Sequence, residues 1–119
     1  MTDGSEVRAT VRYLPMSPQK VGLVVDLVRG MDAVAALEVL QFTPKAAAKP
    51  VHKLLRSAIA NAEENFGLSR DDLYIHQITA DRGPTRRWRR FGARGRFKPI
   101  KRRYTHVTVV LRERPTEQG

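Results

Sequence analysis

Residues 82–103 read RGPTRRWRRFGARGRFKPIKRR, and this stretch, the basic segment, decides how the rest of the chain is interpreted. It holds 11 of the 22 lysines and arginines and none of the 12 acids. The other 97 residues carry 11 basic and 12 acidic side chains, a net charge of −1. Cations this dense repel one another in water unless a polyanion neutralises them. The charge pattern therefore predicts nucleic acid as the partner.

A predicted strand flanks the basic segment on each side. LYIHQITA spans Leu73–Ala80, and YTHVTVVLRE, which alternates and is rich in β-branched residues, spans Tyr104–Glu113. The simplest connection between antiparallel neighbours is a hairpin, here with its tip at Gly92–Gly95 because glycine adopts the positive φ of tight turns. Two arms of about 8 to 10 residues, rising about 3.3 Å each, would reach on the order of 30 Å. Such a hairpin is too long to pack on a small body.

The chain before Leu73 predicts one more strand and three helices. VRATVRYL alternates over Val7–Leu14, which indicates a strand with one wet face. Its apolar face would carry Val7, Ala9, Val11 and Tyr13. A first helix starts at Ser17-Pro18, a cap residue followed by proline, and ends at Gly30. Asp32 can cap a second helix that runs through Phe42.

The third helix has the clearest period, because its apolar residues recur at three- and four-residue spacing up to its end at Gly67. They are Val51, Leu54, Leu55, Ala58, Ile59 and Ala62. Thr43-Pro44 repeats the cap-plus-proline signal, whereas Pro50 falls inside the periodic stretch and removes one backbone donor. Either the helix kinks near residues 46–49 or it starts shortly before Pro50.

These elements give an α+β fold within a single domain of 119 residues with 41% apolar content. We expect a globular body over residues 7–82 and 104–112, a hairpin over 83–103, and flexible termini at 1–6 and 113–119. The absence of cysteine excludes a disulfide scaffold and a thiolate metal site. No apolar run approaches the roughly 20 residues of a membrane span, and residues 1–6 are polar. A cytoplasmic protein without membrane contact is expected.

The candidate site is an RNA-binding surface in the basic segment, where guanidinium groups fork onto phosphates and aromatic rings stack on bases. Trp88 could equally be a core edge. Lys20, Lys45, Lys49 and Lys53 either extend the surface onto the body or only aid solubility. The predicted RNA-binding residues are Arg86, Arg87, Trp88, Arg89, Arg90, Arg94, Arg96, Lys98, Lys101, Arg102, Arg103 and Lys20.

Chemistry of other kinds has no support in the sequence. The three histidines, at 52, 76 and 106, lack metal-ligand spacing. Glu63-Glu64 and Asp71-Asp72 are sequence neighbours, which do not face each other. A phosphate loop, a nucleophile elbow and a cysteine nucleophile are all missing. We therefore expect no catalytic residue, no metal site and no cofactor, and an enzyme is not expected.

Three long motifs, in order and correctly spaced, carry a family resemblance: SPQKVGLVVDLVRG (17–30), RSAIANAEENFG (56–67) and GPTRRWRRFGARGRFKPIKRRYTHVTVV (83–110). With them the chain, from about Val7 to Arg112, resembles bacterial large-ribosomal-subunit protein twenty-two. The resemblance implies a three-stranded antiparallel sheet packed against three helices, with a long protruding basic β-hairpin. It also implies three partners, namely large-subunit ribosomal RNA, neighbouring proteins including protein four, and the nascent peptide.

The resemblance further implies that the hairpin tip lines the wall of the peptide exit tunnel. The residues that match this tip region are Phe91, Gly92, Ala93, Arg94, Gly95, Arg96 and Phe97. Ala93 to Arg96 fit the family pattern, whereas Phe91-Gly92 and Phe97-Lys98 depart from it. Gly22 also stands where a basic residue is common in the family's first helix.

Two competing functions remain. A β-ribbon DNA-binding protein would insert the hairpin into a groove, but such ribbons usually come from symmetric dimers, and no apolar patch in this sequence proposes a dimer face or a homo-oligomer. A nucleic-acid hydrolase would need carboxylates clustered on one face for metal ions, and none are found. Sedimentation separates the three functions, because only a ribosomal protein would collect in the large-subunit fraction.

Overall fold

The computed structural model describes residues 6–83, 86–88, 100–102 and 104–115, and within 86–88 and 100–102 it describes the backbone alone. Along the chain the elements are β1 (Glu6–Leu14), α1 (Pro18–Val28), α2 (Ala33–Gln41), α3 (Ala48–Phe66), the 3-10 turn η1 (Arg70–Asp72), β2 (Leu73–Arg82), β3 (Arg86–Trp88), β4 (Ile100–Arg102) and β5 (Thr105–Glu113). None of the helices among the described residues is long and apolar enough to cross a membrane.

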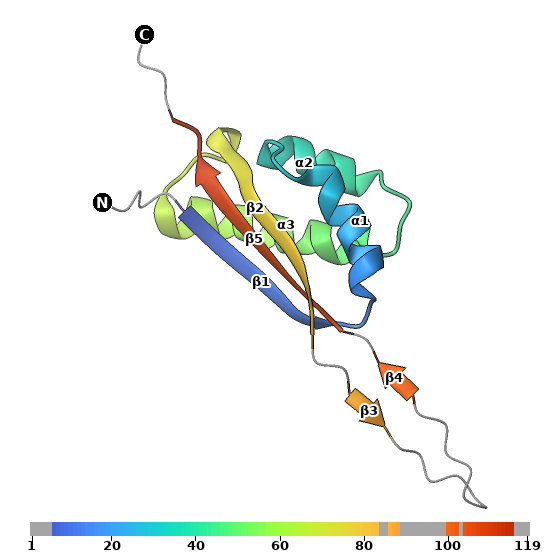
Figure 1. Ribbon diagram of the computed structural model, residues 1–119. Coiled ribbons are helices and arrows are strands. Elements are labelled where there is room, and N and C mark those ends of the chain that lie inside the picture. Colours follow the sequence, from blue (N-terminus) through green and yellow to red (C-terminus); the bar gives the residue numbers. More distant parts are fainter. Residues whose placement is uncertain (1–5, 84–85, 89–99, 103, 116–119) are drawn as a thin grey trace, which may run out of the picture.

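One three-stranded antiparallel sheet forms the body, in the order β1-β5-β2 (Figure 1). The last strand in sequence is therefore the central one, and the three helices cover one face of the sheet (Figure 1). β3 and β4 pair antiparallel as a separate sheet beyond the end of the first (Figure 1). The α+β class is confirmed, whereas the predicted tip at Gly92–Gly95 lies outside the described residues.

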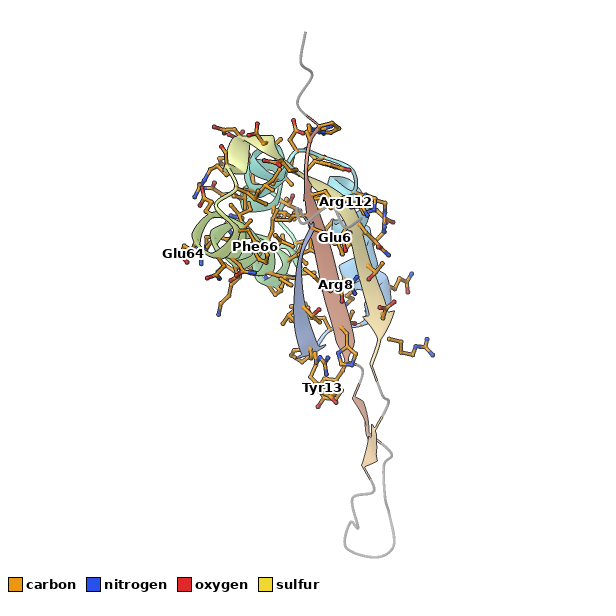
Figure 2. The ribbon with its side chains drawn as sticks, turned by 90° about the vertical axis from the view of Figure 1, so that its left-hand side faces the viewer. Glu6, Arg8, Tyr13, Glu64, Phe66 and Arg112 are labelled. Atoms are coloured by element: carbon orange, nitrogen blue, oxygen red, sulfur yellow. The ribbon has the colours of Figure 1, made fainter. Side chains whose placement is uncertain are left out.

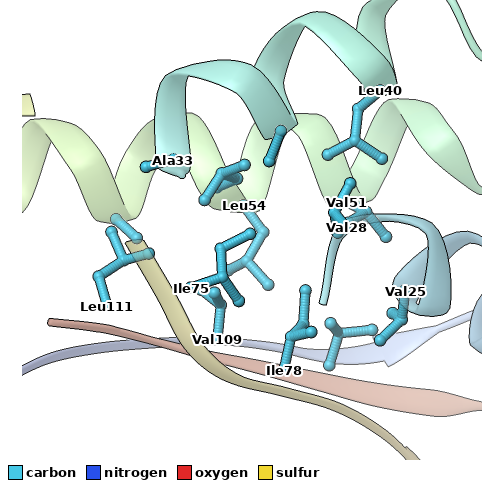
Figure 3. Close-up of a cluster of buried hydrophobic side chains, with 14 of the residues drawn as sticks. Val25, Val28, Ala33, Leu40, Val51, Leu54, Ile75, Ile78, Val109 and Leu111 are labelled. Atoms are coloured by element: carbon cyan, nitrogen blue, oxygen red, sulfur yellow. The ribbon is translucent and has the colours of Figure 1, made fainter. Parts of the chain in front are cut away.

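The core lies between the sheet and the helices, where inward side chains of β2 and β5 meet those of the helices (Figure 3). On α3 all six predicted apolar positions are buried, and burial of a Val, Leu or Ile side chain contributes about 1.5 to 3 kcal/mol. On α1 the valines at 21, 24, 25 and 28 are fully buried. The apolar period of these helices therefore identified the faces that hold the body together.

The predicted start and end of α1 are confirmed. The Ser17 hydroxyl accepts a hydrogen bond from the Lys20 backbone N–H at 3.4 Å, and Pro18 is the first helical residue, where a backbone donor has no partner in any case. After the helix, Gly30 adopts a φ of 80°, which permits the chain to turn back.

The start of α2 differs from the prediction in one respect. Asp32 precedes the helix as expected, but its carboxylate makes no capping hydrogen bond. Instead it accepts one from the Arg114 guanidinium, with Nε 2.6 Å from Oδ1. This charge-assisted bond ties the start of α2 to the residue that follows β5.

α3 starts at Ala48, just before Pro50, so the second of the two predicted alternatives is correct. Pro50 lies in the first turn, where the missing N–H costs no intrahelical bond. Thr43-Pro44 does not open a helix, because the Thr43 hydroxyl donates to the Val39 carbonyl at 2.5 Å and extends the end of α2 instead.

The end of α3 is fixed to η1. Gly67 closes the helix with a φ of 65°, as predicted. Arg70 then donates two hydrogen bonds to the Glu63 carboxylate, at 3.0 and 2.9 Å. These bonds lower the pKa of Glu63 and raise that of Arg70. Arg70 is exposed and Glu63 is partly exposed, so the pair sets the direction of the loop more than it stabilises the body.

The prediction that Tyr13 shares the apolar face of the first strand is wrong. The pairing of β1 with β5 shifts by one residue between Val11 and Leu14, so that Leu14 is buried and Tyr13 is 52% exposed. Tyr13 has a φ of 58°, the left-handed conformation of a bulge. An inserted residue of this kind reverses the alternation of the strand beyond it.

Glu6 and Glu113, which the sequence analysis assigns to the termini, lie in strands of the body. Glu6 belongs to β1 and accepts two hydrogen bonds from Arg112, beside which it lies in Figure 2. Glu113 belongs to β5, and the Arg114 N–H donates to the Asp72 carbonyl at 2.7 Å. Residues 1–5 and 116–119 lie outside the described residues.

Candidate nucleic-acid interface

The described part of the basic segment is a ladder of three residue pairs. β3 and β4 run antiparallel, with Arg86 opposite Arg102, Arg87 opposite Lys101 and Trp88 opposite Ile100. Like charges directly opposite each other across two strands are destabilising, by a few tenths to about 1 kcal/mol each. Two successive cation pairs therefore disfavour the pairing of β3 with β4 by itself. An anion bound along the two strands would make the pairing favourable.

The ladder follows the body sheet along the chain as a separate sheet. The last rungs of the larger sheet pair Arg82 with Thr105 and join the Gly83 N–H to the Tyr104 carbonyl at 2.7 Å. Two residues then lie between Gly83 and Arg86, whereas one lies between Arg102 and Tyr104. The register of the ladder therefore differs by one residue from that of the body sheet.

The predicted RNA-binding residues divide into three groups. Arg86, Arg87 and Trp88 lie on β3, and Lys101 and Arg102 lie on β4, where the backbone brings them together. Lys20 lies exposed on α1. The other predicted contacts, Arg89, Arg90, Arg94, Arg96, Lys98 and Arg103, and the tip residues from Phe91 to Phe97, lie outside the described residues.

Lysines of the body gather around two adjoining grooves. The first has a volume of about 550 Å³, lies between the start of α1 and residues 45–47, and is lined in part by Lys20, Leu23 and Lys45. The second has a volume of about 650 Å³ and is lined in part by Lys45, Lys49 and His52. Three of the four lysines that the sequence left as isolated surface charges thus share one region of the body, and Lys53 lines neither groove.

A cluster that the sequence did not indicate lies where the chain leaves the body. Tyr13, Gly83, Tyr104 and His106, the root cluster, come together at the end of the sheet nearest β3 and β4. Figure 2 shows Tyr13 at that end. Only the bulge turns Tyr13 outward, and strand periodicity cannot reveal a bulge. The one sequence signal that could have indicated this cluster is a tyrosine next to the end of a predicted strand.

The described residues contain no group of three or more His, Asp or Glu side chains that could hold a metal ion. The buried side-chain nitrogen and oxygen atoms in the same part of the chain all have hydrogen-bond partners. The features of this surface are therefore cationic and aromatic, which suits a polyanion with stackable bases.

The family described as ribosomal protein L22p/L17e matches residues 9–112. Proteins named large ribosomal subunit protein uL22 are similar over most of their length. The protein from Synechococcus sp. (strain JA-2-3B'a(2-13)) is 50% identical over 120 residues, covering 100% of this chain and 95% of the relative. The protein from Thermoanaerobacter sp. (strain X514) is 47% identical, covering 92% of this chain and 98% of the relative. The protein from Streptococcus pyogenes serotype M6 is 45% identical, covering 96% of this chain and 100% of the relative. The chain therefore belongs to the ribosomal protein L22p/L17e family, which confirms the resemblance carried by its three motifs.

Proposed function

We propose that this chain is a structural constituent of the large ribosomal subunit that binds large-subunit ribosomal RNA through the basic segment. One observation carries the proposal: residues 82–103 hold the entire net positive charge, and the strand pair β3 and β4 within them lies beyond the end of the body sheet (Figure 1). The family consists of ribosomal components and not of enzymes, so the protein is cytoplasmic and bound to the ribosome.

The mechanism is electrostatic cross-linking of RNA. Phosphates of neighbouring RNA segments repel one another, and a strand pair with cations on both strands can lie between two such segments and neutralise both. Each phosphate that is neutralised releases condensed counterions, which supplies a favourable entropy. Binding also removes the repulsion between the opposed cations of β3 and β4, so RNA binding and strand pairing support each other.

The body contributes a second RNA contact in this proposal. Lys20, Lys45 and Lys49 surround the two grooves beside the start of α1 and the start of α3. Lysines on a rigid body position RNA through its backbone and do not read its sequence. The body would therefore orient the protein on the RNA while the basic segment enters it.

We further propose that the segment from Phe91 to Phe97 lines the exit tunnel, next to protein four and the nascent peptide. Family membership and the family-like run from Ala93 to Arg96 support this part of the proposal. Ala93 and Gly95 leave little side chain at such a tip, and Arg94 and Arg96 add cations beside it.

Photochemical cross-linking within assembled subunits tests the RNA contact. A photoreactive side chain at position 87 should cross-link to large-subunit RNA in the large-subunit sedimentation fraction. The matched control places the same group at position 64, an exposed position on α3 away from β3 and β4 (Figure 2). Equal cross-linking from both positions, or absence of the chain from that fraction, would contradict the proposal.

Deletion of Phe91–Arg96 tests the tunnel role. Among the described residues the hydrophobic core is formed by the body, so in this proposal the melting temperature of the free protein should change little. The variant should still enter large subunits, but those ribosomes should differ in macrolide response or in stalling by nascent peptides. Unaltered drug response and stalling in ribosomes that carry the deletion would remove the tunnel role and leave the RNA contact in place.

A further inference from the structure

Tyr13 holds a costly backbone conformation at an exposed position. Among the described residues it is the only one other than glycine with a positive φ, at 58°. The left-handed conformation costs a residue with a Cβ roughly 1 to 2 kcal/mol. Its effect is to turn the ring out of the sheet, where 52% of the residue remains accessible. Strain that the surrounding structure maintains is found most often at functional sites.

The rest of the root cluster fixes the Tyr13 ring in place. The Tyr13 N–H donates to Nδ1 of His106 at 3.0 Å, across 93 residues of sequence. The ring meets that of His106 at a centroid distance of 4.8 Å and an angle of 90°, and that of Tyr104 at 5.9 Å and 80°. Edge-to-face contacts of this kind are favourable and orient the ring. Tyr13 is therefore both exposed and immobilised.

The absence of a side chain at Gly83 allows Tyr104 and His106 to pack against the backbone there. A Cβ at Gly83 would lie 3.1 Å from the Tyr104 Cβ, 3.1 Å from the Tyr104 carbonyl oxygen and 3.3 Å from Nε2 of His106. The backbone thus lies close to Tyr104 and to the His106 ring, and a side chain at position 83 would require these neighbours to shift. An aromatic surface prepared in this way loses little conformational entropy when a ligand covers it.

The surroundings of the ring favour a nucleobase. Arg12 and Arg82 are exposed beside the root cluster, and the cationic ladder of β3 and β4 follows it along the chain. The exposed carboxylate of Asp81 lies opposite His106, so a phosphate placed directly on the rings would be repelled. A neutral planar base over Tyr13 is not repelled by Asp81, and the phosphates on either side of that base can pair with Arg12 and Arg82.

We propose that Tyr13, oriented by His106 and Tyr104, is a stacking site for one unpaired nucleobase of the RNA that the basic segment binds. This inference rests on the proposed function, because the base belongs to the same RNA. It adds a contact that recognises a base to an interface otherwise made of phosphate contacts. His106 and Tyr104 are positioning residues in this site.

Binding of the full chain to protein-free large-subunit RNA tests the site with three variants. Tyr13→Leu removes the ring and should weaken binding by about 5- to 150-fold, the range for one base–aromatic stack. Tyr13→Phe keeps the ring and should bind like the wild type. Phe66→Leu removes an aromatic residue of similar exposure, 49%, from the end of α3 and should also have no effect. Because no charge changes, the salt dependence should be the same in all four proteins.

Ultraviolet cross-linking of the wild-type complex gives an independent result that does not depend on a variant folding. Zero-length cross-links form where a base stacks on an aromatic ring, so peptide mapping should find a nucleotide on Tyr13 and none on Phe66. Wild-type binding by Tyr13→Leu, an equal loss in Tyr13→Phe, or a map without Tyr13 would each overturn the stacking site. In those cases steep salt dependence would still uphold RNA binding by the basic segment, whereas weak salt dependence of the wild type would refute the proposed function itself.

Discussion

Thr105 joins the start of β5 to the segment before α1 through one buried hydroxyl. The residue is fully buried, and its Oγ1 donates to the Met16 carbonyl at 2.7 Å. Met16 precedes the Ser17 cap, so this bond fixes the point where the chain passes from β1 to α1. The alternation of the strand places Thr105 on the inward face with Val107 and Val109, and Thr108 on the opposite face, but it does not reveal that the Thr105 hydroxyl meets the Met16 carbonyl.

Thr105→Val should lower the free energy of unfolding by about 1 to 3 kcal/mol, because the Met16 carbonyl would remain buried without its donor. Thr108→Val is the matched control, since the hydroxyl of Thr108 bonds that of Thr10 on the exposed face of the sheet. This second change should stay within about 0.5 kcal/mol. Denaturant unfolding measures both free energies. Equal losses would contradict the claim that the Thr105 hydrogen bond stabilises the body more than the exposed one at Thr108.

Gly83→Ala should lower the free energy of unfolding by about 1 to 3 kcal/mol through overpacking. The new Cβ would lie 3.1 Å from the Tyr104 carbonyl oxygen, which accepts a 2.7 Å hydrogen bond from the Gly83 N–H, so a shift of that oxygen would strain the last rung of the sheet. Loss of the Tyr13 ring contacts, seen as altered aromatic NMR shifts, should accompany the change. An alanine variant with wild-type stability and shifts would contradict the close packing of the root cluster.

At the scale of the elements, the two glycines of α1 and α3 have opposite roles. Gly22 lies within α1 at a negative φ, and a Cβ there would meet nothing within 4 Å. Gly22→Ala should therefore raise the free energy of unfolding by about 0.5 to 1 kcal/mol through helix propensity. Gly67→Ala adds the same methyl group in equally open space but at a φ of 65°, and should lower it by about 1 kcal/mol. Thermal melts that shift both variants in one direction would contradict these assignments.

Local patterns predicted the elements, and contacts distant in sequence account for the differences. The apolar period of α3 and the Ser17-Pro18 signal of α1 act within one helix, so the sequence alone contained them. Asp32 does not cap α2 because its carboxylate bonds Arg114, 82 residues away. Tyr13 does not lie on the apolar face of β1, and its N–H bonds His106, 93 residues away. Neither partner can be found from periodicity. The basic segment could be recognised from the sequence because all of its charges are close together in the chain and no acid interrupts them.

At the scale of the whole molecule, charge and hydrophobic burial are separated. The core consists of residues from the body, and the chain outside the basic segment carries a net charge of −1. The basic segment adds 11 positive charges, and the described strands within it pair cation against cation. A molecule divided in this way can change its RNA affinity through the segment while its folding stability, which depends on the core, stays constant.

The salt dependence of binding to a large-subunit RNA fragment tests this division most directly. If the basic segment neutralises about 6 to 8 phosphates, the logarithm of the binding constant should fall against the logarithm of salt concentration with a slope of roughly −4 to −7. Arg86→Glu with Arg87→Glu should flatten that slope, by about 2 if each arginine contacts one phosphate. Arg8→Glu with Arg56→Glu, the same charge change at exposed positions of β1 and α3, should leave it nearly unchanged. A wild-type slope near −1, or equal flattening by the two double variants, would contradict the claim that the basic segment is the RNA-binding part of this protein.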